Sequence, residues 1–154
     1  MAIAALIIVS DQLSKEWIRT NIPLGGATDE VFRISLVHFS NTGAVFGLFA
    51  DRSLILSIVA ILGIILILVF YRQFRLNGIQ SEIALGLILG GAVGNLIDRI
   101  RLGHVTDFIY AHLWGDFYWP AFNVADASIS IGIITLMIFI FITMKKKDEE
   151  TAKS

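Results

Sequence analysis

Long uncharged apolar segments dominate the hydrophobic pattern of this 154-residue chain. Leu54–Tyr71 and Ala127–Met144 each come close to the ~20 apolar residues that cross the hydrocarbon core of a bilayer. Ile83–Ile97 is shorter, but Asp98 and Arg99 can extend it at the interface, where a charge costs much less than at the bilayer centre. The pattern therefore predicts membrane-spanning helices rather than the core helices of a soluble domain.

The first apolar run, Ala2–Val9, reaches the length of a span only if the helix continues through Asp11 and Lys15. Opposite charges four residues apart on a helix face each other and partly neutralise one another. A signal peptide is the alternative, but the run lacks a positively charged start and no small-residue cleavage site follows. We expect an uncleaved first helix, and spans at roughly residues 2–19, 54–71, 83–99 and 126–144.

The connection after the first span has a β-like pattern. In Val31–Phe39, Phe32, Ile34 and Leu36 alternate with smaller or polar residues. The turn-rich segment Asn41–Gly47 follows directly. We therefore expect one domain over residues 1–154, an all-α membrane protein of four transmembrane helices with a small extracytoplasmic β-cradle.

Glycines at every fourth position mark one face of the third predicted span. Gly86, Gly90 and Gly94 form a stripe of small residues, and such stripes let membrane helices approach closely. We expect this face to pack against another helix.

Composition and charge agree with a membrane protein. Hydrophobic residues make up 56% of the chain, charged residues 16%, and the mean hydropathy is +0.77, whereas soluble domains have roughly 25% charged residues. The net charge of -1 leaves no basic footprint for nucleic acid. Arg72, Arg75 and Lys145–Lys147 follow the second and fourth spans, and the positive-inside rule then places both termini in the cytoplasm.

Two aspartates stand in the polar stretch between the third and fourth spans. Because these spans end and begin on the same side, Asp107 and Asp126 are held near one interface. Two close carboxyl groups share a proton, so the ionised one can accept a proton from water while the other polarises a carbonyl, as in aspartic proteases. Structural roles remain equally open on spacing alone, either as helix caps or as partners of Arg99 and Arg101.

Five motifs resemble, in their order and spacing, those of lipoprotein signal peptidase, the bacterial signal peptidase II. They are Asp11-Gln12-Leu13-Ser14-Lys15, Asn41-Thr42-Gly43-Ala44, the run from Gly90 to Arg99, Val105-Thr106-Asp107-Phe108 and Phe122-Asn123-Val124-Ala125-Asp126. The resemblance extends from Asp11 to about Gly132. It implies a four-helix membrane aspartic peptidase that removes the signal peptide from prolipoproteins, cutting before a cysteine that carries diacylglycerol.

The resemblance also implies that Asp107 and Asp126 are the catalytic pair, with no metal or other cofactor. The implied partners are diacylglyceryl-modified prolipoproteins and membrane lipid, without nucleic acid. We expect a monomer in the bacterial cytoplasmic membrane, with its active site at the outer face. Trp114, Tyr118 and Trp119 lie near that face, where they suit an interfacial aromatic belt or a flap over the site.

Further positions match the motifs of the family. They are Asn41, Gly43, Asn95, Asp98, Arg99 and Asn123. The resemblance implies that the amides and the guanidinium hold the substrate backbone or orient the aspartates, and ordinary hydrogen bonding at the interface is the alternative. We expect Asp98 to support the polar cluster, because a third acid in the pair would disturb its protonation. Asp11 and Lys15 are expected to form a structural pair that braces the first helix.

Three rival functions remain open. A zinc protease would use His104, Asp107 and His112, whose side chains suit zinc, although no His-Glu-x-x-His pattern is present. A transporter or channel subunit would also hold charged residues in its spans, but here they gather at one face instead of crossing the midplane. A serine-lysine peptidase built on Lys15 lacks a serine that its spacing singles out.

Overall fold

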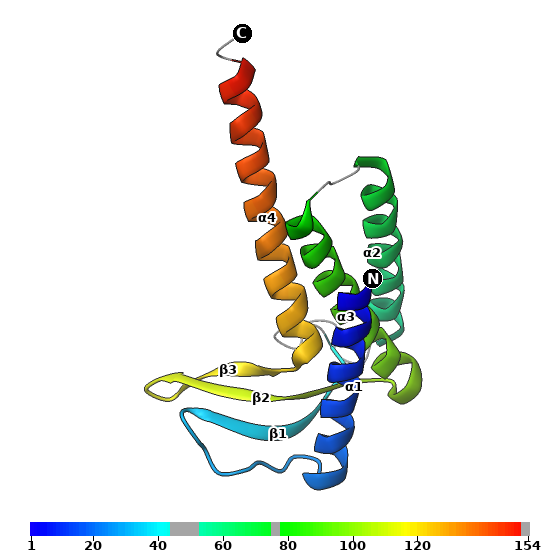
Figure 1. The fold of residues 1–154 in the computed structure, drawn as a ribbon. Helices are drawn as coiled ribbons and strands as arrows, with labels where there is room; N and C mark the ends of the chain where they lie inside the picture. The colour runs from blue at the N-terminus through cyan, green and yellow to red at the C-terminus, as the bar shows by residue number, and fades with distance from the viewer. Residues whose placement is uncertain (44–52, 75–77, 152–154) are drawn as a thin grey trace.

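The computed structural model describes residues 1–43, 53–74 and 78–151. Its elements in chain order are α1 (Ala2–Asn21), β1 (Ile34–Asn41), α2 (Ser53–Phe74), α3 (Ile79–Leu102), β2 (Val105–Trp114), β3 (Phe117–Phe122) and α4 (Val124–Thr151). The helices run alongside one another, and the three-stranded sheet lies across one end of them (Figure 1). A mostly helical fold with a small sheet is thus confirmed.

α3 is the central helix, in contact with α1, α2 and α4. Its stripe of Gly86, Gly90 and Gly94 faces α1. A Cβ atom added at Gly90 would stand 2.9 Å from the carbonyl oxygen of Ala4, and one at Gly94 would stand 2.7 Å from a carboxylate oxygen of Asp11. The glycines therefore allow the close approach that their spacing predicts, and they make room for a charged side chain against the backbone of α3.

The sheet is antiparallel, with the strand order β1-β2-β3. Ile18 and Ile22, at the end of α1, form a buried apolar cluster with Phe108 of β2. This cluster attaches the sheet to the helices. The register pairs Asn41 with Val105, so the end of β1 lies beside the start of β2.

The strand predicted at Val31–Phe39 is wrong at its start. β1 begins at Ile34, because Phe32 and Arg33 have φ angles of 52° and 64°, which interrupt extended backbone. β2 and β3 were not predicted as strands. The turn-rich segment after β1 is described as far as Gly43, and its residues 44–47 lie outside the described part of the chain.

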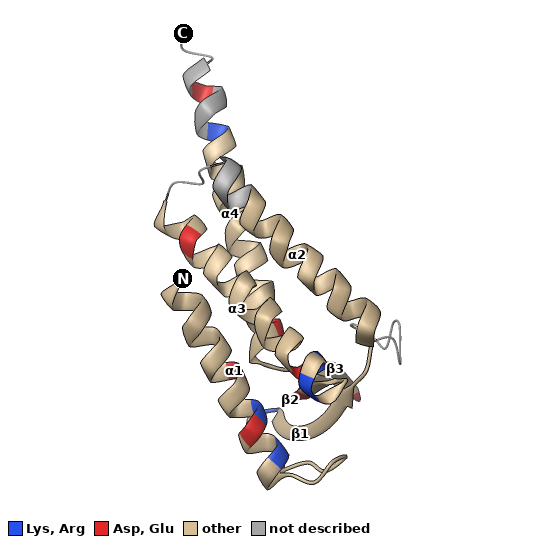
Figure 2. Ribbon diagram, turned by 90° about the vertical axis from the view of Figure 1, so that its right-hand side faces the viewer, with Lys and Arg blue, Asp and Glu red and all other residues tan. Residues whose placement is uncertain are grey.

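The surface of the helices is largely apolar. By length and composition, α3 and the part of α4 from Val124 to Lys145 can each cross a membrane, and Ser53–Val69 of α2 is a shorter apolar helix. Exposed apolar side chains cover α4, among them Met137 and Phe141. In Figure 2 the charged residues gather near the sheet and at the far ends of the helices, whereas the long middle parts of α2 and α4 carry none. Of the cations used to predict orientation, Arg75 lies outside the described residues.

Candidate active site

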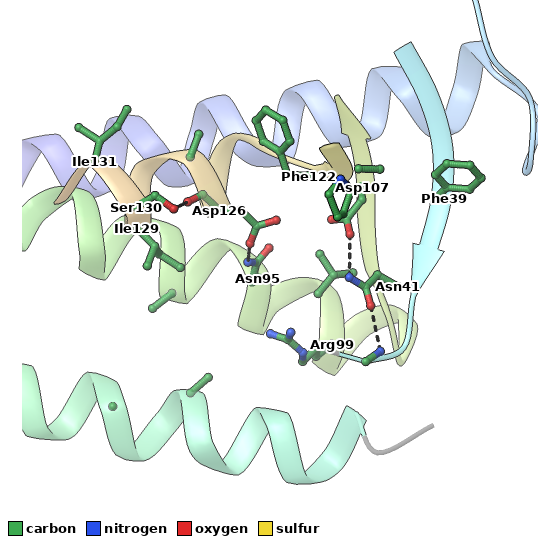
Figure 3. A pocket seen from close by; sticks show the side chains of 18 of the residues that line it. Phe39, Asn41, Asn95, Arg99, Asp107, Phe122, Asp126, Ile129, Ser130 and Ile131 are labelled. Atoms are coloured by element: carbon green, nitrogen blue, oxygen red, sulfur yellow. Dashed lines mark hydrogen bonds between the residues drawn. The ribbon is translucent and has the colours of Figure 1, made fainter. Parts of the chain in front are cut away.

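A cavity of about 1040 Å³ opens where the sheet meets α2, α3 and α4 (Figure 3). Asn41 and Asp107 from the sheet, Asn95 and Arg99 from α3 and Asp126 from α4 line its polar end. Its walls further along the helices are apolar and include Ala60, Gly63, Ile64, Ile67, Ile129 and Ile131. The structure therefore brings both predicted aspartates to one cavity that is polar at one end and apolar along the helices.

Asp126 lies in the first turn of α4, where it forms a reciprocal cap with Asn123. Its backbone N–H donates to Oδ1 of Asn123 over 2.9 Å, and the backbone N–H of Asn123 donates to Oδ2 of Asp126 over 3.4 Å. Oδ1 of Asp126 accepts a further hydrogen bond from Nδ2 of Asn95 at 2.7 Å. The helix N-terminus favours a negative charge at this position. Asp126 therefore caps α4, a role that the sequence left open as an alternative, and it also lines the cavity.

Asp107 lies near the start of β2, with both carboxylate oxygens hydrogen-bonded. Oδ1 accepts from Nδ2 of Asn123 at 2.7 Å, and Oδ2 accepts from Nδ2 of Asn41 at 2.8 Å. Burial and the charge of Asp126 raise the pKa of Asp107 to about 6, although the two amide hydrogen bonds oppose this shift. Asp107 is therefore a carboxyl group that changes its protonation state close to neutral pH.

The asparagine side chains connect the two aspartates with each other and with α1. Asn123 donates to Asp107 and accepts from the backbone of Asp126. Oδ1 of Asn95 accepts from Nζ of Lys15 at 2.9 Å and from Nδ2 of Asn123 at 3.2 Å. Each predicted asparagine of the site thus donates to at least one of the aspartates.

Behind the asparagines lies a buried charge cluster. Lys15 and Asp11 are fully buried and pair at 2.8 Å, and Nζ of Lys15 lies 3.2 Å from Oδ2 of Asp98. Asp11 also accepts a hydrogen bond from the backbone N–H of Ala125 at 2.9 Å, and Asp98 accepts one from the backbone N–H of Thr106 at 3.1 Å. The cluster therefore ties α1 and α3 to the starts of β2 and α4, which are the segments that carry the two aspartates.

Arg99 and Gly43 occupy different parts of the cavity. The Arg99 side chain points from α3 to the cavity (Figure 3) and makes no hydrogen bond or ion pair with a described residue. Gly43 donates its backbone N–H to Oδ1 of Asn41 at 2.9 Å, which leaves Nδ2 of that amide facing Asp107. Arg101 is exposed, so within the described part of the chain neither arginine pairs with the aspartates. Arg99 thus lines the polar end of the cavity together with the two aspartates.

Three members of the cluster were not identified as site residues from the sequence. Gln12 donates to Asp98 at 3.2 Å, and Arg19 donates to Oγ1 of Thr106 at 3.0 Å and lies 3.7 Å from Asp98. Arg19 follows Lys15 by four residues on the same helix face, a spacing that signals a shared environment. The contact between Arg19 and Thr106 joins positions 87 residues apart, which no local pattern reveals.

The side chains proposed for the rival zinc site do not form a metal-binding cluster. Among residues 1–43, 53–74 and 78–151, no group of three His, Cys, Asp or Glu side chains is placed to hold a metal ion. His112 lies further along β2, where its ring nitrogens hydrogen-bond to Glu30 and to the backbone carbonyl of Gly115. Both oxygens of Asp107 are engaged by asparagines. The geometry therefore gives the zinc hypothesis no support.

Several known proteins with similar sequences share one name. The family model described as signal peptidase (SPase) II matches residues 3–142. The lipoprotein signal peptidase of Syntrophotalea carbinolica is 39% identical over 142 residues, which cover 90% of this chain and 88% of the relative. The lipoprotein signal peptidase of Dehalococcoides mccartyi is 41% identical over 140 residues, covering 88% and 84%. That of Pseudomonas aeruginosa is 36% identical over 157 residues, covering 97% and 90%.

Solved structures extend the similarity to the fold. One structure of a bacterial membrane enzyme has a TM-score of 0.87 at 28% identity, covering 95% of this chain and 89% of the other. A second has a TM-score of 0.80 at 30% identity, covering 90% of each chain. Sequence, fold and apolar surface agree that this is an integral membrane peptidase, and the chain belongs to the signal peptidase II family.

Proposed function

We propose that this chain is a membrane aspartic endopeptidase that removes the signal peptide from bacterial prolipoproteins, cutting before a diacylglyceryl-modified cysteine. The proposed catalytic pair is Asp107 and Asp126. The observation that carries the proposal is their convergence on one cavity, where amide groups hold both carboxylates and the pKa of Asp107 is raised to about 6. Relatives named lipoprotein signal peptidase support the substrate class.

The chemistry needs one water and no covalent intermediate with the enzyme. A water held between the two acids attacks the scissile carbonyl. One carboxylate accepts the proton of the water, and the other carboxyl group donates its proton to the carbonyl oxygen. The tetrahedral intermediate collapses, the C–N bond breaks, and the leaving nitrogen takes a proton. The products are a signal peptide with a new carboxylate and a lipid-modified cysteine with a free amine.

The two parts of the cavity suit the two parts of such a substrate. The apolar wall from α2 and α4, with Gly63, Ile64 and Ile131, suits the apolar signal segment and leaves its lipid in the bilayer. Asn41 and Arg99 at the polar end suit the peptide backbone beside the scissile bond, because both present donors there. In this arrangement Asn95 and Asn123 orient the acids, Gly43 holds Asn41, and Asp98 supports the cluster behind them.

We also propose that all four helices cross the cytoplasmic membrane, with both termini in the cytoplasm and the sheet at the outer face. The parallel course of the helices in Figure 1 supports this topology, as do the exposed apolar side chains of α2 and α4. α1 carries charges, but its fully buried Asp11 and Lys15 neutralise each other. All proposed site residues come from one chain, which is consistent with a monomer.

Cleavage of a diacylglyceryl-modified prolipoprotein by the purified protein in detergent tests the proposal. Asp107→Asn and Asp126→Asn should each lower turnover by roughly 10²–10⁴-fold, the range of general acid–base catalysis. Asp116→Asn changes an exposed aspartate of the β2–β3 turn in the same way and should retain turnover. EDTA, a metal chelator, should leave the wild-type rate unchanged.

Two outcomes would overturn the assignment. Wild-type turnover in either folded dyad variant would remove that aspartate from the chemistry. A folded wild-type protein that cuts no lipid-modified substrate would reject the peptidase proposal itself, and the circular dichroism spectrum of each variant establishes that it is folded.

A further inference from the structure

Only one of the two proposed catalytic acids, Asp126, accepts a side-chain hydrogen bond from an amide that itself contacts the buried ammonium group of Lys15. We propose that Lys15 is a positioning residue, which acts through Asn95 to keep the negative charge on Asp126 and leave the shared proton on Asp107. This inference rests on the proposed function of the two aspartates. It assigns different roles to them, with Asp126 as the base that accepts the proton of water and Asp107 as the acid that polarises the carbonyl.

Lys15 contacts an amide oxygen of the site in addition to the two carboxylates with which it forms ion pairs. Its side chain is fully buried, and its ammonium group has three N–H donors. Two of these donors face Asp11 at 2.8 Å and Asp98 at 3.2 Å. Arg19, the second cation near these carboxylates, lies 3.7 Å from Asp98. The third donor of Lys15 faces Oδ1 of Asn95 at 2.9 Å. That contact leads out of the cluster and into the site.

Lys15 determines which way the Asn95 amide points. An ammonium group only donates hydrogen bonds, so the oxygen of the amide must face Lys15 and its NH₂ group must face away. Nδ2 of Asn95 then donates to Oδ1 of Asp126 at 2.7 Å. The positive charge polarises this amide and strengthens its donation to the carboxylate. Asp126 thus receives a hydrogen bond that favours its ionised form.

Neither amide that donates to Asp107 contacts Lys15 directly, and Asn123 is connected to it only through the oxygen of Asn95. Asn41 is oriented by the backbone N–H of Gly43 at 2.9 Å, and Asn123 is oriented by the backbone N–H of Asp126 at 2.9 Å. Asp107 also lies away from the N-terminus of α4, which favours negative charge on Asp126. The two carboxylates therefore have different environments, although each accepts hydrogen bonds from amides.

The other charged groups near the two aspartates do not cancel the difference between the environments of Asp107 and Asp126. Burial is the main cause that raises the pKa of Asp107 to about 6, followed by the negative charge of Asp126. Asp11 and Asp98 both pair with Lys15, and Asp98 also lies 3.7 Å from Arg19, whose closer partner is Glu16 at 2.9 Å. Among the described residues that line the cavity, Arg99 is the remaining charged group, and α2 and β3 contribute none.

The double variant Lys15→Gln/Asp11→Asn tests the role of Lys15 while keeping the cluster neutral. Asp98 retains Arg19 as a cationic neighbour, and asparagine at position 11 retains an oxygen for the backbone N–H of Ala125. The positive charge of Lys15 favours ionisation of the pair as a whole and has a minor lowering effect on the pKa of Asp107 itself. Its loss should therefore raise the pKa of the shared proton. The high-pH limb of kcat/KM, which reports loss of the shared proton, should move up by about 0.5–1 pH unit.

Asp11→Asn alone is the matched control, because it retains Lys15. Its high-pH limb should stay in place or move down. A purely structural role of Lys15 would lower activity or stability in the double variant without moving the limb. An unmoved limb in a folded double variant therefore overturns the positioning role. If instead Asp107→Asn or Asp126→Asn retains wild-type turnover, the proposed function fails, whatever Lys15 does.

A second measurement decides the location of the proton without relying on activity. The carboxyl carbons of ¹³C-labelled aspartate in the wild-type protein are followed by NMR as pH is varied. The signals are assigned by their absence in Asp107→Asn and Asp126→Asn. Under the proposal, Asp107 should titrate near pH 6, and Asp126 should lose its proton at a lower pH than Asp107. The reverse order overturns the proposal, even if the double variant does not fold.

Discussion

Asp107 experiences opposing effects from its surroundings. Burial and the charge of Asp126 disfavour its ionised form, whereas the amides of Asn41 and Asn123 favour it. Its pKa in the folded protein lies above the ordinary 3.8, so its contribution to stability is greatest below that pH and is lost as the pH rises to about 6. At neutral pH the ionised side chain therefore costs stability, which is common for groups positioned for function.

Asp107→Asn should consequently stabilise the fold near pH 7 while it abolishes cleavage. A shift of about two pKa units corresponds to at most about 3 kcal/mol. Part of this gain is offset, because the amides of Asn41 and Asn123 both donate to Asp107. The NH₂ group of an asparagine at position 107 would face one of these donors and could not accept its hydrogen bond. We expect a net gain of about 1 kcal/mol in the free energy of unfolding, measured by thermal unfolding in detergent. The gain should vanish near pH 4, and lower stability than wild type at both pH values would contradict it.

At the level of elements, the helices were easier to predict than the strands. Apolar length and glycine spacing are local properties, and they located the segments that became α1 to α4. β2 and β3 have no comparable local signal, because β2 is a strand through its pairing with β1 across more than sixty residues, as in the 66-residue separation of Asn41 and Asp107. The start of β1 was missed because the positive φ angles of Phe32 and Arg33 are not specified by glycine or asparagine.

The contact between α1 and α3 can be tested with glycine substitutions. A Cβ atom at Gly90 would stand 2.8 Å from Cβ of Ile7, whereas one at Gly63 of α2 would meet nothing within 4 Å. Gly90→Ala should lower the free energy of unfolding by about 1–3 kcal/mol through overpacking. Gly63→Ala should leave it unchanged or raise it by up to about 1 kcal/mol, because alanine favours helix. Equal stability of the two variants would show that the glycine stripe does not set this contact.

At the level of the whole molecule, charge and topology act together. The buried cluster of Asp11, Lys15 and Asp98 joins α1 and α3 to the starts of β2 and α4, which carry the two proposed acids. The middle parts of α2 and α4 carry no charged residues, whereas charged residues gather near the sheet. In the proposed topology, this arrangement would bring lipid-modified substrate and catalytic water to the same boundary.

Single cysteines can establish the orientation, because the chain contains none of its own. Asp116→Cys places a thiol in the exposed β2–β3 turn, and Lys145→Cys places one near the far end of α4. In intact spheroplasts, a membrane-impermeant thiol reagent should label the first variant at once and the second only after permeabilisation. The opposite order of labelling would invert the proposed topology, and equal labelling of both in sealed cells would contradict a transmembrane α4.

The amino-acid sequence was sufficient to predict the helical segments, the placement of both aspartates at one end of the bundle and the family to which the chain belongs. These follow from apolar length, from the direction in which successive spans run, and from motifs read in order along the chain. The packed fold was needed to show that the side chains of Asn95 and Asn123 donate to different acids, that Asp126 caps α4, and that Lys15 reaches the site through an amide. Hydrogen bonds and pKa shifts depend on separations of a few ångströms between segments far apart in sequence, and only packing sets such distances.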